Sequence, residues 1–113
     1  MPYIEVRTNI KVSQEKEINV KEKLGQAVTL IGKSESWLMV EITDLCRLWF
    51  KGKSDSPTAF VEVKLLGKAS PSSYGKLTGE ICDILSQELA VNPSSIYVKY
   101  EEIEHWGYNG GMF

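Results

Sequence analysis

One order of elements, a strand followed by a helix and a second strand, occurs twice in this chain of 113 residues and constrains its fold more than any other feature. In the first half, apolar and polar residues alternate over residues 3–8, which is typical of a half-buried strand. Ser13 can cap a helix in which apolar residues recur at three- and four-residue steps up to Ile31, before Gly32 ends it. A short apolar run at residues 37–42, rich in branched and aromatic side chains, then predicts a buried strand.

The second half repeats this order at an offset of roughly 57 residues. It predicts a strand over residues 59–66, a helix over 71–90 and a strand over 95–101. Ser70 is a candidate cap of this helix, Pro71 suits its first turn, and Asn92-Pro93 follows its end. Between the halves, residues 45–58 predict a loop rich in turn-forming residues, in which Trp49 and Phe50 need cover from the rest of the molecule.

Two such units of nearly equal length predict an α/β fold in a pseudo-two-fold arrangement, with one four-stranded sheet and both helices on one face. The length suits one core, so we expect a single domain spanning residues 1–113. Because the helices leave the other face of the sheet bare, we expect that face to be apolar and to associate with another chain. The glycine-rich aromatic tail, residues 104–113, is expected to dock onto its own chain or onto a neighbour.

The charge pattern excludes several classes of partner. The formal net charge is −2, and no cluster of Lys and Arg could follow a phosphate backbone, so we expect no nucleic acid. The N-terminus lacks the features of a secretory signal, and no window reaches the length of a membrane span. We therefore expect a cytoplasmic protein without membrane contact, and export by a route that needs no signal peptide stays open.

The two cysteines indicate neither a disulfide nor a metal centre. Cys46 and Cys82 lie far apart, and no second Cys or His stands at metal-ligand spacing from either of them. We expect both thiols to be reduced and Cys82, within the apolar pattern of the second helix, to be a small buried hydrophobe.

Pro2 is the first residue whose position suggests chemistry. Removal of Met1, which a small second residue permits, would leave a secondary amine at the chain terminus. Burial in an apolar pocket disfavours the charged form of an amine and lowers its pKa from about 8 toward neutrality, which suits a general base. The alternative is that Pro2 only begins an edge strand, a place where proline is tolerated.

Five short segments, in this order and spacing, resemble the macrophage migration inhibitory factor (MIF) and D-dopachrome tautomerase family of the tautomerase superfamily. They are Met1-Pro2, Gly32-Lys33, Leu66-Gly67-Lys68, Ile96-Tyr97-Val98 and the ending Trp106-Gly107-Tyr108-Asn109-Gly110. The resemblance covers essentially the whole chain. It implies a homotrimer in which three four-stranded sheets form a barrel with the helices outside, and an active site at each subunit interface. It also implies an isomerase of the phenylpyruvate tautomerase type that needs no metal and no organic cofactor.

The resemblance assigns roles to the N-terminal proline and to two further residues of the site. Pro2 would be the base that moves a proton between carbon and oxygen of the substrate. Lys33 would pair with the substrate carboxylate and favour the neutral form of the Pro2 amine. The backbone N–H of Leu66 would reach a substrate oxygen. By position alone, Lys33 would equally suit an interaction with the carbonyl groups at the end of the first helix.

Aromatic residues complete the site that the resemblance implies. Tyr97, contributed by the neighbouring subunit, would line the pocket and donate a hydrogen bond to the enol oxygen, although a strand tyrosine also has an ordinary structural reading. Tyr108 would close the mouth of the pocket, and Tyr3 and Trp106 would frame the same cavity.

Three positions depart from the family pattern or fall outside it. Lys99 stands where animal members often carry an amide that meets the far end of the substrate, so its added cation leaves the preference at that end open. Residues 56–59 read Ser-Pro-Thr-Ala in place of a Cys-x-x-Cys pair, so we expect no thiol–disulfide activity. His105, the only histidine, has no family role, and we expect it to be solvated or to cap a local turn.

The leading hypothesis is thus a keto–enol tautomerase for phenylpyruvate-like aromatic α-keto acids, with D-dopachrome as a further candidate substrate. The alternative is a MIF-like cytokine or host-modulating signalling protein, with a cell-surface receptor as its partner and vestigial catalysis. A third reading is a trimeric scaffold whose pocket binds another metabolite.

Overall fold

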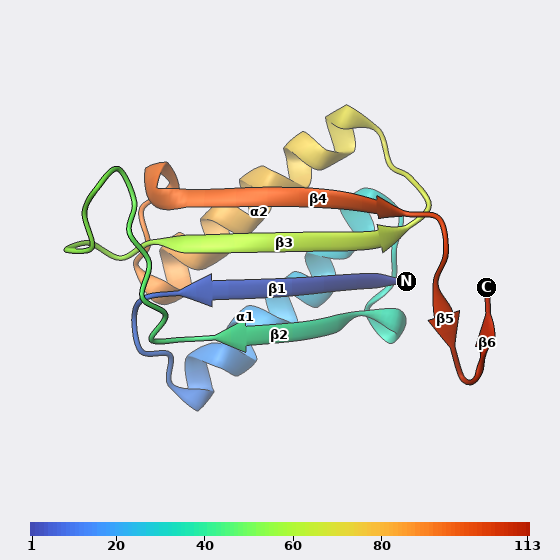
Figure 1. Cartoon of the computed structure of the whole chain (residues 1–113), viewed down its shortest axis with the longest axis horizontal. Coiled ribbons are helices and arrows are strands. Elements are labelled where there is room, and N and C mark those ends of the chain that lie inside the picture. The colour runs from blue at the N-terminus through green and yellow to red at the C-terminus, as the bar shows by residue number, and fades with distance from the viewer.

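The computed structural model describes residues 1–113, which form one mixed sheet with two helices against one of its faces (Figure 1). In chain order the elements are β1 (Pro2–Thr8), α1 (Gln14–Ala27), η1 (Val28–Ile31), η2 (Glu35–Trp37), β2 (Met39–Thr43), β3 (Ala59–Leu66), α2 (Pro71–Leu89), η3 (Pro93–Ser95), β4 (Ile96–Ile103), β5 (Gly107–Tyr108) and β6 (Gly111–Met112). The two predicted strand–helix–strand units are confirmed. Strands β1 and β3, helices α1 and α2, and strands β2 and β4 each begin 57 residues apart.

The strands lie in the order β2-β1-β3-β4. The two central strands, β1 and β3, are antiparallel, and each has the second strand of its own unit beside it in parallel orientation. Each unit therefore supplies half of the sheet, and the two halves meet along the pairing of β1 with β3. This topology places the start of β1 and the ends of β3 and β4 at the same end of the sheet (Figure 1).

The helices begin and end where side-chain chemistry predicts. The side chain of Ser13 accepts from the N–H of Lys16, and that of Ser70 accepts from the N–H of Ser73. The first helix tightens into η1 and ends at Gly32, whose φ of 72° is in the left-handed region that favours glycine. α2 ends at Leu89, one residue before the predicted end, because Ala90 takes a left-handed conformation.

The core lies between the helices and one face of the sheet. Its fully buried side chains come alternately from the central strands and from the inner faces of the two helices; among them are Ile4, Val6, Val61, Val63, Leu65, Leu24, Leu77, Ile81, Ile84 and Leu85. Cys82 is only partly buried against this core, not fully buried as expected. No helix of the protein is long and apolar enough to cross a bilayer.

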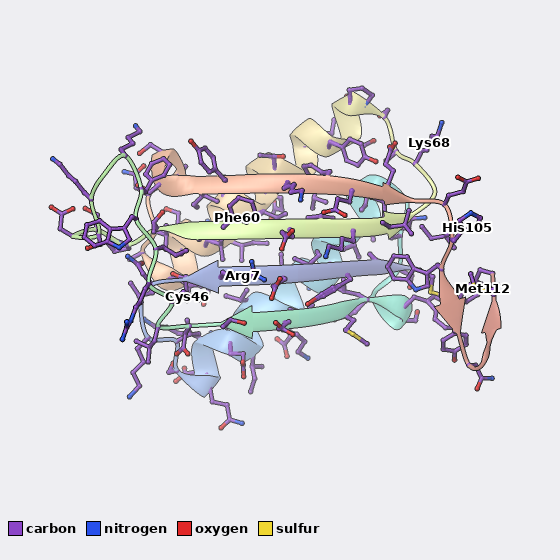
Figure 2. The ribbon with its side chains drawn as sticks, in the orientation of Figure 1. Arg7, Cys46, Phe60, Lys68, His105 and Met112 are labelled. Atoms are coloured by element: carbon purple, nitrogen blue, oxygen red, sulfur yellow. The ribbon has the colours of Figure 1, made fainter.

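The opposite face of the sheet is bare, as expected, but the expectation that it is apolar is wrong. Glu41, Glu5, Glu62 and Lys99 stand in register across the four strands and form a charged row. Arg7 also projects from this face, with Phe60 beyond it on the neighbouring strand (Figure 2). Ionic and hydrogen-bonding groups, rather than a large apolar patch, therefore occupy the uncovered side.

Two local predictions need correction. Trp37 does not begin a strand: the side chain of Ser34 accepts from the N–H of Ser36 and caps the 3₁₀ turn η2, so that β2 starts at Met39. β2 is an edge strand with alternating exposed residues, not a buried strand. Trp49 also lacks the expected cover, since 73% of it is exposed, whereas Phe50 packs edge to face on Tyr97 with ring centroids 5.1 Å apart.

Candidate active site

The end of the sheet at which β1 begins holds an aromatic cavity of about 680 Å³, within the range of small-molecule sites. Its walls come from the start of β1, the η2 turn with the residue that begins β2, one lysine of β3, and the tail before and within β5. The lining residues are Met1, Pro2, Tyr3, Ser36, Trp37, Leu38, Met39, Lys64, Trp106, Gly107 and Tyr108. The structure thus brings together three of the predicted site residues, Pro2, Tyr3 and Tyr108, as well as Trp106.

The C-terminal tail folds back to form the outer wall of this cavity (Figure 1). β5 and β6 pair as a hairpin, and the N–H of Phe113 donates to the carbonyl oxygen of Trp106. The ring of Trp37 meets Tyr108 edge to face at 5.1 Å and Phe113 at 6.2 Å, while Tyr108 stacks on Phe113 at 5.5 Å. The tail therefore docks onto its own chain through three aromatic rings.

Sequence reasoning missed five members of the cavity wall: Ser36, Trp37, Leu38, Met39 and Lys64. Trp37 was assigned to a strand, and Met39 to the same strand without a site role. Lys64 alternates with buried β3 residues and was read only as part of that strand. The positions of Trp37 and Met39 depend on the η2 turn, and that of Lys64 depends on its pairing opposite Tyr3. From the alternation of apolar and polar residues, one can predict only that Lys64 lies on the same sheet face as Tyr3.

Lys33 and Leu66 lie beside the chain terminus. Gly32 turns the chain after η1, and the Nζ of Lys33 then donates to the carbonyl oxygen of Leu66 at 2.9 Å. Burial, and after it the positive charge of Lys33, lower the pKa of the Met1 amino group from its ordinary value of 8.0. The predicted neighbourhood of Lys33 and the N-terminus is thus present.

Met1 occupies the one backbone donor that the predicted site needs. The N–H of Leu66 donates to the carbonyl oxygen of Met1 at 3.0 Å, while the next N–H, that of Gly67, donates to Ile103 within the sheet region. Loss of Met1 would therefore uncover two groups together, the amine of Pro2 and the N–H of Leu66.

Of the other predicted site residues, Lys33 and Leu66 lie beside the chain terminus but do not line this cavity, and Tyr97 and Lys99 lie far from it within one chain. Pro2 pairs with Leu65, and Leu65 with Glu102, so roughly 17 Å of strand separates the level of Pro2 from that of Tyr97. Tyr97 instead packs on Phe50 and Phe60 at the far end of the sheet. A role for it beside Pro2 requires a second copy of the chain.

Lys99 belongs to an ionic network on the bare face. Its Nζ lies 2.8 Å from Glu101 and 3.6 Å from Glu62, and the hydrogen bond and charge of Glu101 raise the pKa of Lys99. The charge of Lys99 is thus already matched by acidic neighbours in its own chain.

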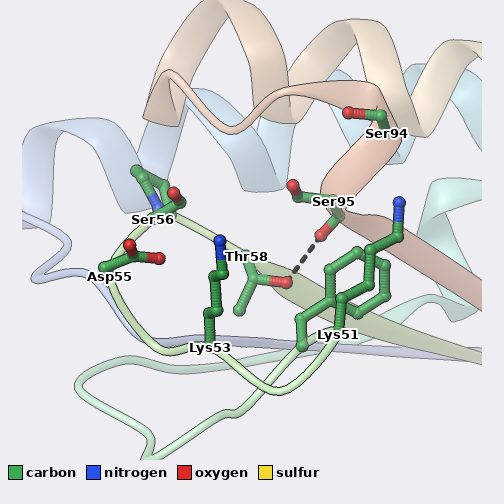
Figure 3. A pocket seen from close by; sticks show the side chains of 9 residues that line it. Lys51, Lys53, Asp55, Ser56, Thr58, Ser94 and Ser95 are labelled. Carbon is green, nitrogen blue, oxygen red and sulfur yellow. Dashed lines mark hydrogen bonds between the residues drawn. The ribbon is translucent and has the colours of Figure 1, made fainter.

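A second hollow, at the opposite end of the sheet, has a different character (Figure 3). Lys51, Lys53 and Asp55 line it together with several hydroxyl groups, and the hydroxyl of Thr58 donates to the carbonyl oxygen of Ser95 at 2.7 Å. Its lining of one carboxylate, two ammonium groups and hydroxyls has Phe50 as its single aromatic ring, so this hollow lacks the aromatic walls of the first cavity. No group of three or more His, Cys, Asp or Glu side chains is placed to hold a metal ion, and His105 is exposed in the tail.

The aromatic cavity offers a distinct chemistry. It combines the terminal amine of Met1, whose pKa is lowered, the ammonium group of Lys64 for an anionic ligand, and flat apolar walls for a ring. An amine that is neutral near physiological pH can accept a proton, and the nearby positive charges would stabilise an enolate or a carboxylate.

Comparison with known proteins gives one consistent match. The sequence profile described as "Macrophage migration inhibitory factor (MIF)" matches residues 1–113. The macrophage migration inhibitory factor of Meriones unguiculatus is 30% identical over 118 residues, covering 100% of this chain and 99% of that protein.

Solved structures extend the match to the fold. The crystal structure of Leishmania major MIF2 is 28% identical, with a TM-score of 0.93 over 100% of this chain and 97% of that one. The macrophage migration inhibitory factor homologue from Prochlorococcus marinus is 25% identical, with a TM-score of 0.89 over 98% of each chain. With a profile match along its full length and this fold, the chain belongs to the macrophage migration inhibitory factor family of the tautomerase superfamily.

Proposed function

We propose that this protein is a keto–enol tautomerase for phenylpyruvate-like aromatic α-keto acids, with the amine of Pro2 as its general base after removal of Met1. The observation that carries the proposal is the place of Pro2, which is buried at an aromatic cavity beside a terminal amine whose pKa is lowered. Family membership supports tautomerase chemistry at this position.

In the proposed reaction, the neutral amine removes the proton from the enol oxygen and delivers it to the adjacent carbon, which yields the ketone. The reverse transfer forms the enol, and the reaction requires no electron transfer and no further group. Lys33 would attract the carboxylate of the substrate, and the N–H of Leu66, freed from Met1, would donate to a substrate oxygen. The rings of Trp37 and Tyr108 would hold the aryl group.

The proposed active unit is a homotrimer in which a neighbouring copy brings Tyr97 and Lys99 to the cavity. The distance of both residues from Pro2 within one chain, and the bare face and open β2 edge of the sheet, support an assembly. Members of the MIF family are oligomers. Sedimentation equilibrium should give three times the chain mass, and a stable monomer that turns substrate over would overturn this part of the proposal.

The catalytic test compares three forms of the protein in the ketonisation of enol-phenylpyruvate, followed by absorbance. These are protein whose mass confirms the loss of Met1, protein with one additional N-terminal residue, and Pro2→Gly. We expect only the first to be fast and the others to lose about 10²- to 10⁴-fold in kcat/KM, the usual contribution of a general base. Equal rates in all three, with unchanged circular dichroism, would contradict a role for the Pro2 amine. D-dopachrome would serve as the second substrate in the same comparison.

The pH profile gives an independent check. Burial and Lys33 lower the pKa of the Met1 amine, and we expect the same surroundings to act on the Pro2 amine once Met1 is removed, so that its basic form persists below pH 8. We expect kcat/KM to fall as the pH drops through this lowered pKa, since protonation removes the base. In Lys33→Met, the midpoint of this fall should move to higher pH.

A second candidate function is signalling to another cell. It is favoured by the names of the vertebrate relatives and by the exposed Trp49 and Leu45, which lie on a loop at the end of the molecule away from the cavity. Pro2→Gly would abolish turnover and leave such signalling intact. Loss of both together would tie the response to catalysis.

A further inference from the structure

Lys64 is the only charged side chain that lines the aromatic cavity. It lies on β3 directly opposite Tyr3 of β1, one pair of residues away from the pairing of Pro2 with Leu65. Its Nζ lies 5.7 Å from the centre of the Tyr3 ring, and the residue as a whole is half-buried. The ammonium group is thus held over one wall of the cavity beside the N-terminal proline.

Lys64 differs from the other cations of the same sheet face in having no acidic partner. Arg7 lies 3.1 Å from Glu5 and 3.6 Å from Glu62, and Lys99 lies 3.6 Å from Glu62 and 2.8 Å from Glu101. Glu101 is also the residue opposite Lys64 on β4, but its closest cation is Lys99 at 2.8 Å. No carboxylate lies within 4 Å of the ammonium group of Lys64, and its charge contributes to the lowered pKa of Glu101 only after Lys99, so Lys64 has no ion pair of its own and is open to a ligand.

Lys33 supplies a second unmatched positive charge at the same end of the sheet. Its Nζ is bonded to the carbonyl oxygen of Leu66, two residues beyond Lys64 on β3. Alternate residues of a strand are roughly 7 Å apart, so Lys33 contacts β3 close to Lys64, just outside the residues that line the cavity. No acidic residue lines the cavity between them. A monocarboxylate would pair with one of these charges and leave the other without an anionic partner.

We propose that Lys64 is a specificity-determining residue that binds a second negative group of the substrate, so that the preferred substrates are 2-keto acids with another anionic group remote from the keto carbon. This inference rests on the proposed tautomerase function and names the substrate class of the same site. The carboxylate next to the keto group would remain with Lys33, and the remote anion would meet Lys64 above the ring of Tyr3.

Two substrates that differ by one charge test the inference. Enol-phenylpyruvate carries one carboxylate, and enol-4-carboxyphenylpyruvate carries a second at the remote end of the same ring. We expect protein free of Met1 to prefer the second substrate by about tenfold in kcat/KM, as a charge-assisted hydrogen bond would give. Lys64→Met keeps the length of the side chain without the charge and should remove most of this preference. Its effect on phenylpyruvate should be several times smaller.

Two further variants make the measurement specific. Lys64→Arg should retain the preference, because the positive charge remains. Lys76→Met removes a charge from an exposed position of α2, on the helical side of the sheet, and should change neither substrate. Absence of a preference in the unmodified protein, or an equal loss for both substrates in Lys64→Met, would overturn the inference.

The inference and the proposed function can fail separately. If no form turns over either keto acid, the tautomerase proposal fails, and equilibrium binding of the two compounds, followed by the fluorescence of Trp37 and Trp106, decides the role of Lys64. Tighter binding of the dianion that Lys64→Met abolishes would support the inference. Equal binding of the two compounds would contradict the inference.

Discussion

The two faces of the sheet are built from the same strands but are stabilised in different ways. On β3, Val61, Val63 and Leu65 are fully buried under the helices, while the alternating Glu62 and Lys64 face the uncovered side. On the helical face, the strands pack against helices α1 and α2 of the same chain. The bare face keeps a row of three glutamates and one lysine, in which positive charges only partly match the acidic groups. The first face therefore determines the fold, whereas the second remains responsive to pH, ligands and neighbouring copies.

The largest effect should follow from damage to the helical face. Ile81 on α2 is fully buried in the core, so Ile81→Ala would leave a cavity and lower the free energy of unfolding by about 3 kcal/mol. Denaturation in urea at a fixed protein concentration would measure the loss. A change below about 1 kcal/mol would mean that the helical face is less tightly packed than its burial indicates.

Adjacent residues of one strand give a sharper version of the comparison. Val61→Ala on the helical side should cost roughly 2 kcal/mol. Glu62→Gln, its neighbour on the bare side, should change the free energy of unfolding much less, because its ion pairs to Arg7 and Lys99 are 3.6 Å long and both cations are about half exposed. Equal losses in urea denaturation would show that the two faces contribute alike.

The next effect concerns the acidic row and depends on pH. The hydrogen bond shared with Glu41, followed by burial, raises the pKa of Glu5 above its ordinary 4.5, so the folded state holds this proton more tightly than the unfolded state. Stability should fall as the pH rises from 4.5 through the raised pKa. Glu5→Gln should thus raise the melting temperature at pH 7 by on the order of a few degrees and leave it unchanged at pH 4.

Glu41 provides the matched control for this titration. Its own pKa is lowered by the same hydrogen bond with Glu5, which places the shared proton on Glu5, the more buried of the two. In Glu41→Gln, the pKa of Glu5 measured by carboxyl NMR should move down toward its ordinary value. An unchanged pKa would assign the shift to burial alone.

The smallest effect is expected for an exposed pair on the bare face. Lys99 lowers the pKa of Glu101 through a hydrogen bond and its charge, and the two side chains are 52% and 37% exposed. Lys99→Met should raise the pKa of Glu101 without a measurable change in the melting temperature. A clear loss of stability would indicate that the ionic network stabilises the sheet more than this exposure suggests.

The elements themselves were predictable because their signals are local. Ser13, Ser70, Gly32 and Pro71 mark the helix ends, and alternation on residues 3–8 and 59–66 marks the central strands. The start of β2 was misplaced because the side chain of Ser34 stabilises a short 3₁₀ turn that aromatic and branched residues would not suggest.

The charge of the bare face was visible in the same alternation, at Glu5 and Arg7. The absence of helices over a sheet face does not determine whether its side chains are apolar, so the expectation of an apolar face was wrong.

The site was less predictable from the chain alone, because it depends on contacts between segments far apart in the sequence. Pro2 and Lys33 follow from chemistry and resemblance, but the meeting of Trp37 with Tyr108 depends on the path of the tail. The cavity role of Lys64 depends on strand register. The position of Tyr97 far from Pro2 shows that one copy of the chain does not contain every residue of the proposed site.

The constant spacing of 57 residues between corresponding elements has a practical consequence. β1 and β3 are the corresponding first strands of the two units. The two halves of the molecule therefore meet through one antiparallel pairing of equivalent strands. A break in the loop of residues 44–58 would yield two pieces of similar size, each a complete strand–helix–strand with one unpaired inner edge. When the two pieces are expressed separately, they should associate by pairing these inner edges, which would make this chain a scaffold for split-protein complementation.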